Sequence, residues 1–156
     1  MATRILIADD HEIVLEGIRT LLNKARRGWE VCGEARNGKD ALEMVKNLRP
    51  DVVVLDVTMP LMSGLEAASE IAKLQSGGKV LIFTMHESER LEVEVRNAGA
   101  QGYVLKSQAA RDLVRAIDAL LEGDTFYGES RKLVIEKKEK EKENPGSIFR
   151  RALAFA

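Results

Sequence analysis

The chain has 156 residues, and 45% of them are hydrophobic, which is enough for one domain with a well-formed core. The formal net charge of −1 gives no overall field that favours nucleic acid or a membrane surface. The charges are unevenly spread, however. Residues 1–128 carry 16 basic and 20 acidic side chains, whereas residues 129–156 carry 8 and 5. We therefore predict a domain over 1–128 and a distinct charged tail over 129–156.

Cysteine and hydropathy exclude several classes of protein. Cys32 is the only cysteine, so the chain has no internal disulfide and no multi-cysteine zinc site, and we interpret Cys32 as a small buried hydrophobe. No apolar run approaches the ~20 residues that span a bilayer, and the first residues show no secretory signal. We expect a cytoplasmic protein without membrane contact.

In chain order, short apolar runs alternate with segments of helical periodicity. Residues 5–8 predict a strand, 14–25 a helix, 31–35 a weaker strand, 41–48 a helix closed by Pro50, and 52–55 a strand. Residues 65–74 then predict a helix, 80–83 a strand, 88–98 a short helix, 102–105 a weaker strand, and 110–121 a strongly amphipathic helix.

Five strands alternating with five helices predict an α/β fold. Strands rich in Val and Ile are typical of a parallel sheet buried on both faces. We therefore predict a doubly wound, five-stranded parallel sheet with helices on both faces. In such folds the functional crevice lies at the carboxyl ends of the strands.

Polar side chains mark these strand ends. Asp9 and Asp10 follow the first strand, and Asp56, Thr84 and Lys106 follow the third, fourth and fifth. Carboxylates ~4 Å apart repel by about 4 kcal/mol at an effective dielectric constant near 20, so crowded acids either hold a proton or bind a divalent cation. Oxygen ligands favour Mg²⁺ over Zn²⁺. With Lys106 and Thr84 as donors, the set predicts a clamp for a phosphoryl group and a carboxylate able to attack it.

Four segments carry a resemblance to a known family: ILIADDHEIV, VVVLDVTMPLMSG, LIFTMHE and GYVLK. In this order and spacing they resemble the receiver domain of two-component response regulators, over residues 4–128. The residues of these segments are most similar to those of receivers of the LuxR/NarL class. The resemblance implies a flavodoxin-like receiver fold.

The resemblance also implies roles at the metal and phosphorylation site. Asp56 matches the phosphoacceptor. Asp10 matches a direct Mg²⁺ ligand, Asp9 a ligand acting mainly through water, and the backbone carbonyl of Thr58 a third protein ligand. His11 is interpreted as a solvent-facing residue.

Other matched positions concern switching and hydrolysis. Thr84 and Lys106 match the switch hydroxyl and lysine that bind the phosphoryl group. Tyr103 matches the switch aromatic, which we expect to rotate inward after phosphorylation. Thr58 and His86 match positions that tune hydrolysis of the aspartyl phosphate, with inert rim residues as the alternative for both.

The implied function is a phosphorylation-controlled signalling switch. A sensor histidine kinase supplies the phosphoryl group, and the domain catalyses only its own phosphotransfer and dephosphorylation. The output is a changed partner-binding or dimerisation face. There are two alternatives. One is an Asp-nucleophile phosphatase of haloacid-dehalogenase type, which would need its nucleophile at the end of the first strand. The other is a pseudo-receiver that binds a partner without being phosphorylated.

The sequence departs from the family pattern in two places. Ser107 replaces the proline that often follows the lysine, so we expect a trans peptide and a plain helix cap there. The 28 residues after Gly128 are too few for a helix-turn-helix domain, and their basic residues alternate with Glu. We therefore expect a charged helix over about 130–143 and no DNA binding by this chain alone. Whether it is a stand-alone receiver or part of a longer regulator stays open.

Overall fold

The computed structural model describes residues 2–76 and 78–127. Its elements are β1 Arg4–Ala8, α1 Glu12–Lys24, β2 Glu30–Ala35, α2 Gly38–Leu48, β3 Val52–Asp56, α3 Gly64–Leu74, β4 Lys79–Thr84, α4 Leu91–Asn97, β5 Gly102–Leu105, the 3₁₀ helix η1 Lys106–Gln108, α5 Ala109–Leu121 and β6 Phe126–Tyr127. Each predicted strand and helix of the domain is present, with ends that differ by a few residues. The predicted tail helix over 130–143 lies outside the described residues.

The strands form one parallel sheet in the order β2-β1-β3-β4-β5-β6. This is a doubly wound, flavodoxin-like arrangement, as predicted. The prediction of five strands was wrong by one, because β6 pairs with β5 at the sheet edge. Gly102 permits this pairing, since a Cβ at that position would lie 2.3 Å from the Phe126 carbonyl oxygen. The Tyr127 hydroxyl also donates a hydrogen bond to the Ala100 carbonyl oxygen at 2.7 Å.

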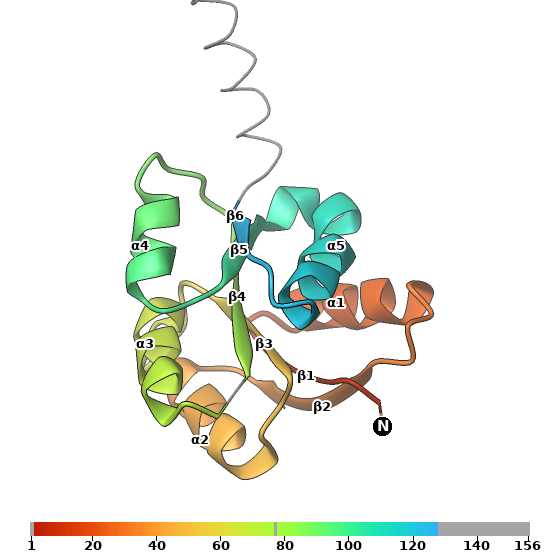
Figure 1. The fold of residues 1–156 in the computed structure, drawn as a ribbon, viewed down its shortest axis with the longest axis horizontal. Helices are drawn as coiled ribbons and strands as arrows, with labels where there is room; N and C mark the ends of the chain where they lie inside the picture. Colours follow the sequence, from red (N-terminus) through yellow and green to blue (C-terminus); the bar gives the residue numbers. More distant parts are fainter. Residues whose placement is uncertain (1, 77, 128–156) are drawn as a thin grey trace, which may run out of the picture.

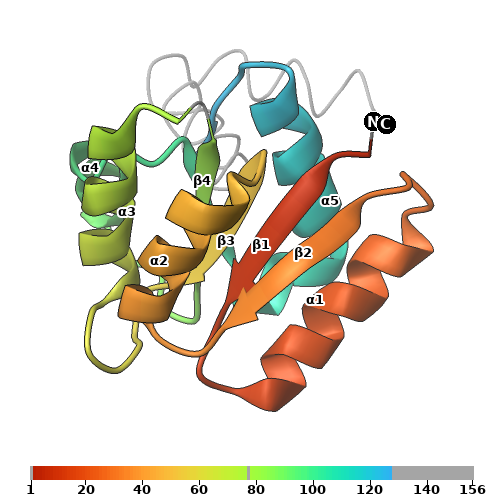
Figure 2. The ribbon, with the colours of Figure 1, turned by 90° about the horizontal axis from the view of Figure 1, so that it is seen from below.

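Two helical layers cover the sheet, with α1 and α5 on one face and α2, α3 and α4 on the other (Figures 1 and 2). Successive side chains of β1 point to opposite faces of the sheet. Ile5 and Ile7 pack in the core under α1 and α5, and Leu6 and Ala8 pack in the core on the opposite face. All four side chains are essentially inaccessible to solvent. A strand buried on both faces explains the continuous apolar runs in the sequence.

The helix starts differ in how they are capped. The Asn37 side chain accepts a hydrogen bond from Asp40 N at 2.7 Å, and the Ser63 hydroxyl accepts one from Glu66 N at 3.1 Å, which sets the starts of α2 and α3. Ser107 was wrongly expected to be a plain helix cap. It lies inside η1, and α5 begins two residues later without a side-chain cap. The expected trans bond is present, because the described residues contain no cis peptide.

All parallel strands direct their carboxyl ends to the same edge of the sheet, and the loops there carry the residues of the candidate site.

Within residues 2–76 and 78–127, no helix is both long and apolar enough to cross a bilayer.

Candidate functional site

The predicted polar residues do meet at the carboxyl edge of the sheet. Asp9 directly follows β1, Asp56 and Thr84 are the last residues of β3 and β4, and Lys106 directly follows β5. Asp9 is fully buried, and Asp56 and Thr84 are each 5% exposed. Buried polar side chains are costly unless they are paired, so their gathering here makes this edge the candidate functional site.

Lys106 connects the first and third strands. Its Nζ lies 2.7 Å from Asp9 Oδ2 and 3.3 Å from Asp56 Oδ1. The side chain is mostly buried and passes over the Phe83 ring, with Nζ 5.9 Å from the ring centroid. Lys106 thus presents one fixed positive charge to two carboxylates.

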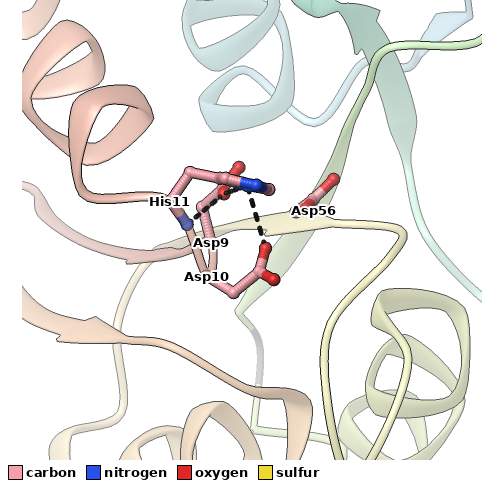
Figure 3. Close-up of side chains that lie close together, drawn as sticks. All are labelled: Asp9, Asp10, His11 and Asp56. Carbon is pink, nitrogen blue, oxygen red and sulfur yellow. Dashed lines mark hydrogen bonds and ion pairs between the residues drawn. The ribbon is translucent and has the colours of Figure 1, made fainter.

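Asp10 and His11 complete the cluster (Figure 3). His11 Nδ1 lies 3.2 Å from Asp9 Oδ1 and 3.0 Å from Asp10 Oδ1. Ligand atoms of Asp9, Asp10, His11 and Asp56 all lie within 4.8 Å of one another. The interpretation of His11 as a purely solvent-facing residue was incomplete: its side chain is 62% exposed, but Nδ1 is directed at the acid pair. Its place immediately after the two aspartates was the signal in the sequence.

The pKa values of the central pair reflect this crowding. Burial raises the pKa of Asp56 above its usual value, and the neighbouring Asp9 carboxylate adds to the effect, which outweighs the opposing influence of Lys106. Burial alone would lower the pKa of Lys106, but its contacts with Asp9 and Asp56 more than offset this and raise that pKa. Lys106 therefore stays charged at neutral pH, while Asp56 ionises at a cost.

The remaining predicted residues surround this centre. Thr84 Oγ1 accepts a hydrogen bond from the backbone N–H of His86 at 3.3 Å, and the His86 side chain is exposed. Thr58 is exposed in the loop after β3. Tyr103 is only 3% exposed and packs in the core on the α4 side of the sheet. Its rotation after phosphorylation stays a prediction.

The donor set fits a hard divalent cation. Three carboxylates face one ammonium group, so the cluster keeps an excess of two negative charges when all four groups are ionised. Asp9 Oδ2 is buried and forms an ion pair with Lys106 but no hydrogen bond of normal geometry. Oxygen ligands with this excess charge suit Mg²⁺, which retains water molecules in its remaining positions.

Comparison with known proteins decides the family. The family model described as the response regulator receiver domain matches residues 5–118 of this chain. The chain belongs to the response regulator receiver domain family. Chemotaxis protein CheY of Thermotoga maritima is 35% identical over 118 residues, which are 76% of this chain and 97% of that protein. Response regulator UvrY of Escherichia coli K12 is 38% identical over 122 residues, or 78% of this chain and 56% of UvrY.

The structural comparison agrees with this assignment. The crystal structure of a two-component response regulator of the LuxR family from Aurantimonas sp. SI85-9A1 superposes with a TM-score of 0.80, at 36% identity, covering 90% of this chain and all of that one. The LuxR/NarL resemblance is thus confirmed. The chain spans about half the length of several curated relatives, UvrY among them.

Proposed function

We propose that this receiver domain is a phosphorylation-controlled switch, with Asp56 as phosphoacceptor and the phosphohistidine of a sensor histidine kinase as donor. The observation that carries the proposal is the convergence of Asp56, Lys106 and Thr84 with the acid pair at one edge of the sheet. Family membership supports it. A haloacid-dehalogenase phosphatase is disfavoured, since the matched family is that of receivers.

The carboxylates of Asp10 and Asp56 and the backbone carbonyl of Thr58 would hold Mg²⁺ directly, with Asp9 acting through water. When bound, the cation neutralises excess negative charge and draws phosphoryl oxygens towards the acids. Asp56 is the suitable nucleophile because the last residue of β3 is held by strand pairing opposite Phe83 of β4. Its position therefore varies little as the donor approaches.

Phosphotransfer is an in-line displacement at phosphorus. A carboxylate oxygen of Asp56 forms the new O–P bond while the P–N bond of the phosphohistidine breaks, and the electron pair of that bond remains on the kinase imidazole. Lys106 Nζ, 3.3 Å from Asp56 Oδ1, is placed to donate hydrogen bonds to the incoming oxygens. Thr84 Oγ1 accepts from the His86 N–H, so its own hydroxyl hydrogen is available to the phosphoryl group.

The switch then follows from a change of partners. In this structure Lys106 is bound to Asp9 and Asp56. A phosphoryl group adds up to two negative charges beside it and competes for its N–H donors. Movement of Thr84 towards the phosphoryl group would propagate through β4 to Tyr103, which pairs with Ile82 in the sheet. The output is altered binding of a partner or of a second copy, with Thr58 and His86 tuning the lifetime of the aspartyl phosphate.

The central test is phosphorylation of the whole chain by a small-molecule phosphodonor with Mg²⁺, followed by intact mass. The wild type should gain one phosphoryl group and Asp56→Asn none. Asp51→Asn is a matched control, because Asp51 precedes the same strand at its opposite end, where it accepts a hydrogen bond from Arg4 N. Undiminished labelling of Asp56→Asn would refute the assignment. Absence of labelling in the wild type, with Mg²⁺ binding retained, would favour the pseudo-receiver alternative.

A second test separates metal binding from switching. Lys106→Ala should still bind Mg²⁺, because the ammonium group is not a ligand, but should lose the conformational response to a phosphoryl mimic. Chemical shifts of β4 and β5 amides would report both Mg²⁺ binding and the conformational response. Loss of Mg²⁺ binding with an intact response would contradict these roles.

We propose a domain boundary near Gly128, with residues 129–156 as a charged tail that does not bind DNA by itself. Removing the tail should leave phosphorylation of Asp56 intact. Sequence-specific duplex binding at near-physiological salt that is lost with the tail would reveal an output function in this segment.

A further inference from the structure

We propose that Gly38, the first residue of α2, is a positioning residue for metal binding. It holds the β3–α3 loop (residues 57–63), which carries the Thr58 carbonyl, in the conformation that binds Mg²⁺. The inference rests on the proposed function, in which that carbonyl is a metal ligand. It gives a role to α2, which lies beside α3 (Figure 2) and contains none of the residues predicted for the site.

A single backbone hydrogen bond joins the start of α2 to the β3–α3 loop. Gly38 N donates to the Met62 carbonyl oxygen at 3.1 Å. The approach leaves no room for a side chain, because a Cβ at Gly38 would lie 2.1 Å from that oxygen and 2.7 Å from the carbonyl carbon. Only glycine therefore allows α2 to contact the loop in this way.

The loop requires fastening because it contains a strained residue. Leu61 has a φ of +67°, a left-handed conformation that costs a residue other than glycine roughly 1–2 kcal/mol. Its side chain is 80% exposed, so packing does not offset the strain. Strained residues persist only where the surrounding structure holds them. Gly64 N, which donates to the Val57 carbonyl oxygen at 2.9 Å, closes the base of the loop, and Gly38 holds Met62.

A shift of Met62 has a short path to Thr58. Met62 N donates to the Pro60 carbonyl oxygen at 2.7 Å, and the proline ring fixes its own φ, so this turn moves as a unit. Thr58 is exposed two residues before Pro60. The competing explanation is that Met59, which is buried in the core, stops the shift before it reaches Thr58. In that case Gly38 has a structural role only.

In Gly38→Ala the loop should yield rather than the helix. The new methyl group and the Met62 oxygen must separate by about 0.9 Å, the difference between 3.0 and 2.1 Å. The start of α2 is fixed by the Asn37 cap and by the buried side chains of Ala41 and Val45. Mg²⁺ demands near-ideal octahedral geometry with ligands at about 2.1 Å, so a displacement of this size at one ligand weakens binding.

Calorimetric titration of the full-length chain with MgCl₂ tests the proposal. Gly38→Ala should bind Mg²⁺ at least about tenfold more weakly, as expected for loss of a group that supports a metal ligand. Gly102→Ala is the matched control, because a Cβ there would lie 2.3 Å from the Phe126 carbonyl oxygen, at the opposite edge of the sheet. It should lose stability but keep its Mg²⁺ affinity. Equal losses of affinity in both variants, or none in Gly38→Ala, would overturn the proposal.

The dependence of phosphorylation on Mg²⁺ concentration separates positioning of the metal from damage to the phosphoacceptor. With a small-molecule phosphodonor, Gly38→Ala should need at least about tenfold more Mg²⁺ for half-maximal rate. Its rate at saturating Mg²⁺ should approach that of the wild type, because Asp56 keeps its place in β3. A lower maximal rate with unchanged half-saturation would contradict the assignment.

Hydrogen exchange of the wild type gives a test that does not depend on the folding of a variant. If the bond from Gly38 favours the metal-binding loop, Mg²⁺ must in turn favour the bond, since coupling between two binding events is reciprocal. Protection of the Gly38 amide should therefore rise on addition of Mg²⁺. The reference is the Lys79 amide, which donates to the Asp51 carbonyl oxygen at 2.9 Å at the opposite edge of the sheet. An equal rise at both amides would overturn the proposal.

Asp10→Asn distinguishes failure of this inference from failure of the proposed function. If Asp10→Asn leaves Mg²⁺ affinity intact, the metal site itself is misplaced and the role of Gly38 falls with it. If Asp10→Asn loses Mg²⁺ while Gly38→Ala binds it like the wild type, the site stands and only the role of Gly38 is wrong.

Discussion

Replacing Gly64 by alanine tests how tightly the loop after β3 holds Asp56. A Cβ at Gly64 would lie 1.9 Å from the Asp56 carbonyl oxygen and 2.7 Å from the carbonyl carbon, distances far below the 3.0 Å limit of real Cβ contacts. Backbone atoms cannot rotate away as a side chain does. The two segments must therefore separate by about 1.1 Å, the difference between 3.0 and 1.9 Å.

This separation has an energetic cost that can be estimated from the contacts. Gly64 N donates a hydrogen bond to the Val57 carbonyl oxygen at 2.9 Å, which a shift of this size would break. Loss of the bond costs roughly 0.5–1.5 kcal/mol and overpacking roughly 1–3 kcal/mol. We expect the free energy of unfolding to fall by about 2–4 kcal/mol. A displacement of Asp56 by about 1 Å should also slow its phosphorylation on the order of 100-fold.

Urea unfolding followed by circular dichroism measures the stability, and intact mass over time measures the phosphorylation rate. Gly17→Ala is the matched control, because Gly17 lies in α1 and a Cβ there would meet nothing within 4 Å. Alanine at this helical position should raise stability by about 0.5–1 kcal/mol. The reasoning would be refuted if Gly64→Ala stayed within about 0.5 kcal/mol of the wild type, the usual range of harmless surface changes.

Three further variants test the packing and charge of the domain by urea unfolding. Asp56→Asn should stabilise the metal-free protein at pH 7. Burial and, secondly, the Asp9 carboxylate raise the folded-state pKa of Asp56, so this group adds stability at low pH that is lost as pH rises through that pKa, and the neutral amide avoids the loss. A lower denaturation midpoint of the variant in EDTA would contradict this. Tyr127→Phe removes the hydroxyl donor to the Ala100 carbonyl at 2.7 Å and should cost about 1–2 kcal/mol, and no change would mean that this bond does not anchor β6. Ile117→Ala, at a fully buried position of α5, should cost about 2–5 kcal/mol, far more than Leu121→Ala, where the side chain is 39% exposed; equal losses would show that the α5 core is misassigned.

Local sequence pattern by itself determined the order of the elements and the parallel sheet. Continuous runs such as residues 52–55 are apolar because both faces of the strand are covered. Since the carboxyl ends of parallel strands meet at one edge, the same pattern also predicted that Asp9, Asp56 and Lys106 would lie together. These conclusions depend only on periodicity and chain direction, which are local properties.

The sixth strand was decided only by tertiary structure. Phe126–Tyr127 is too short to show any periodicity. Its pairing depends on Gly102, 24 residues earlier, which leaves room for the Phe126 carbonyl, and on the hydroxyl contact of Tyr127 with Ala100. A non-local contact of this kind leaves no signal in a short window of sequence.

Side-chain directions within the site were likewise decided by the fold. The sequence does not say which carboxylate Lys106 contacts, and in the structure its Nζ lies 2.7 Å from Asp9 Oδ2 and 3.3 Å from Asp56 Oδ1. The turn of His11 towards the acid pair follows from its backbone hydrogen bond to Asp9 at the start of α1. Residue type and spacing specify which groups arrive at the sheet edge, whereas packing and charge around them specify which atoms face one another.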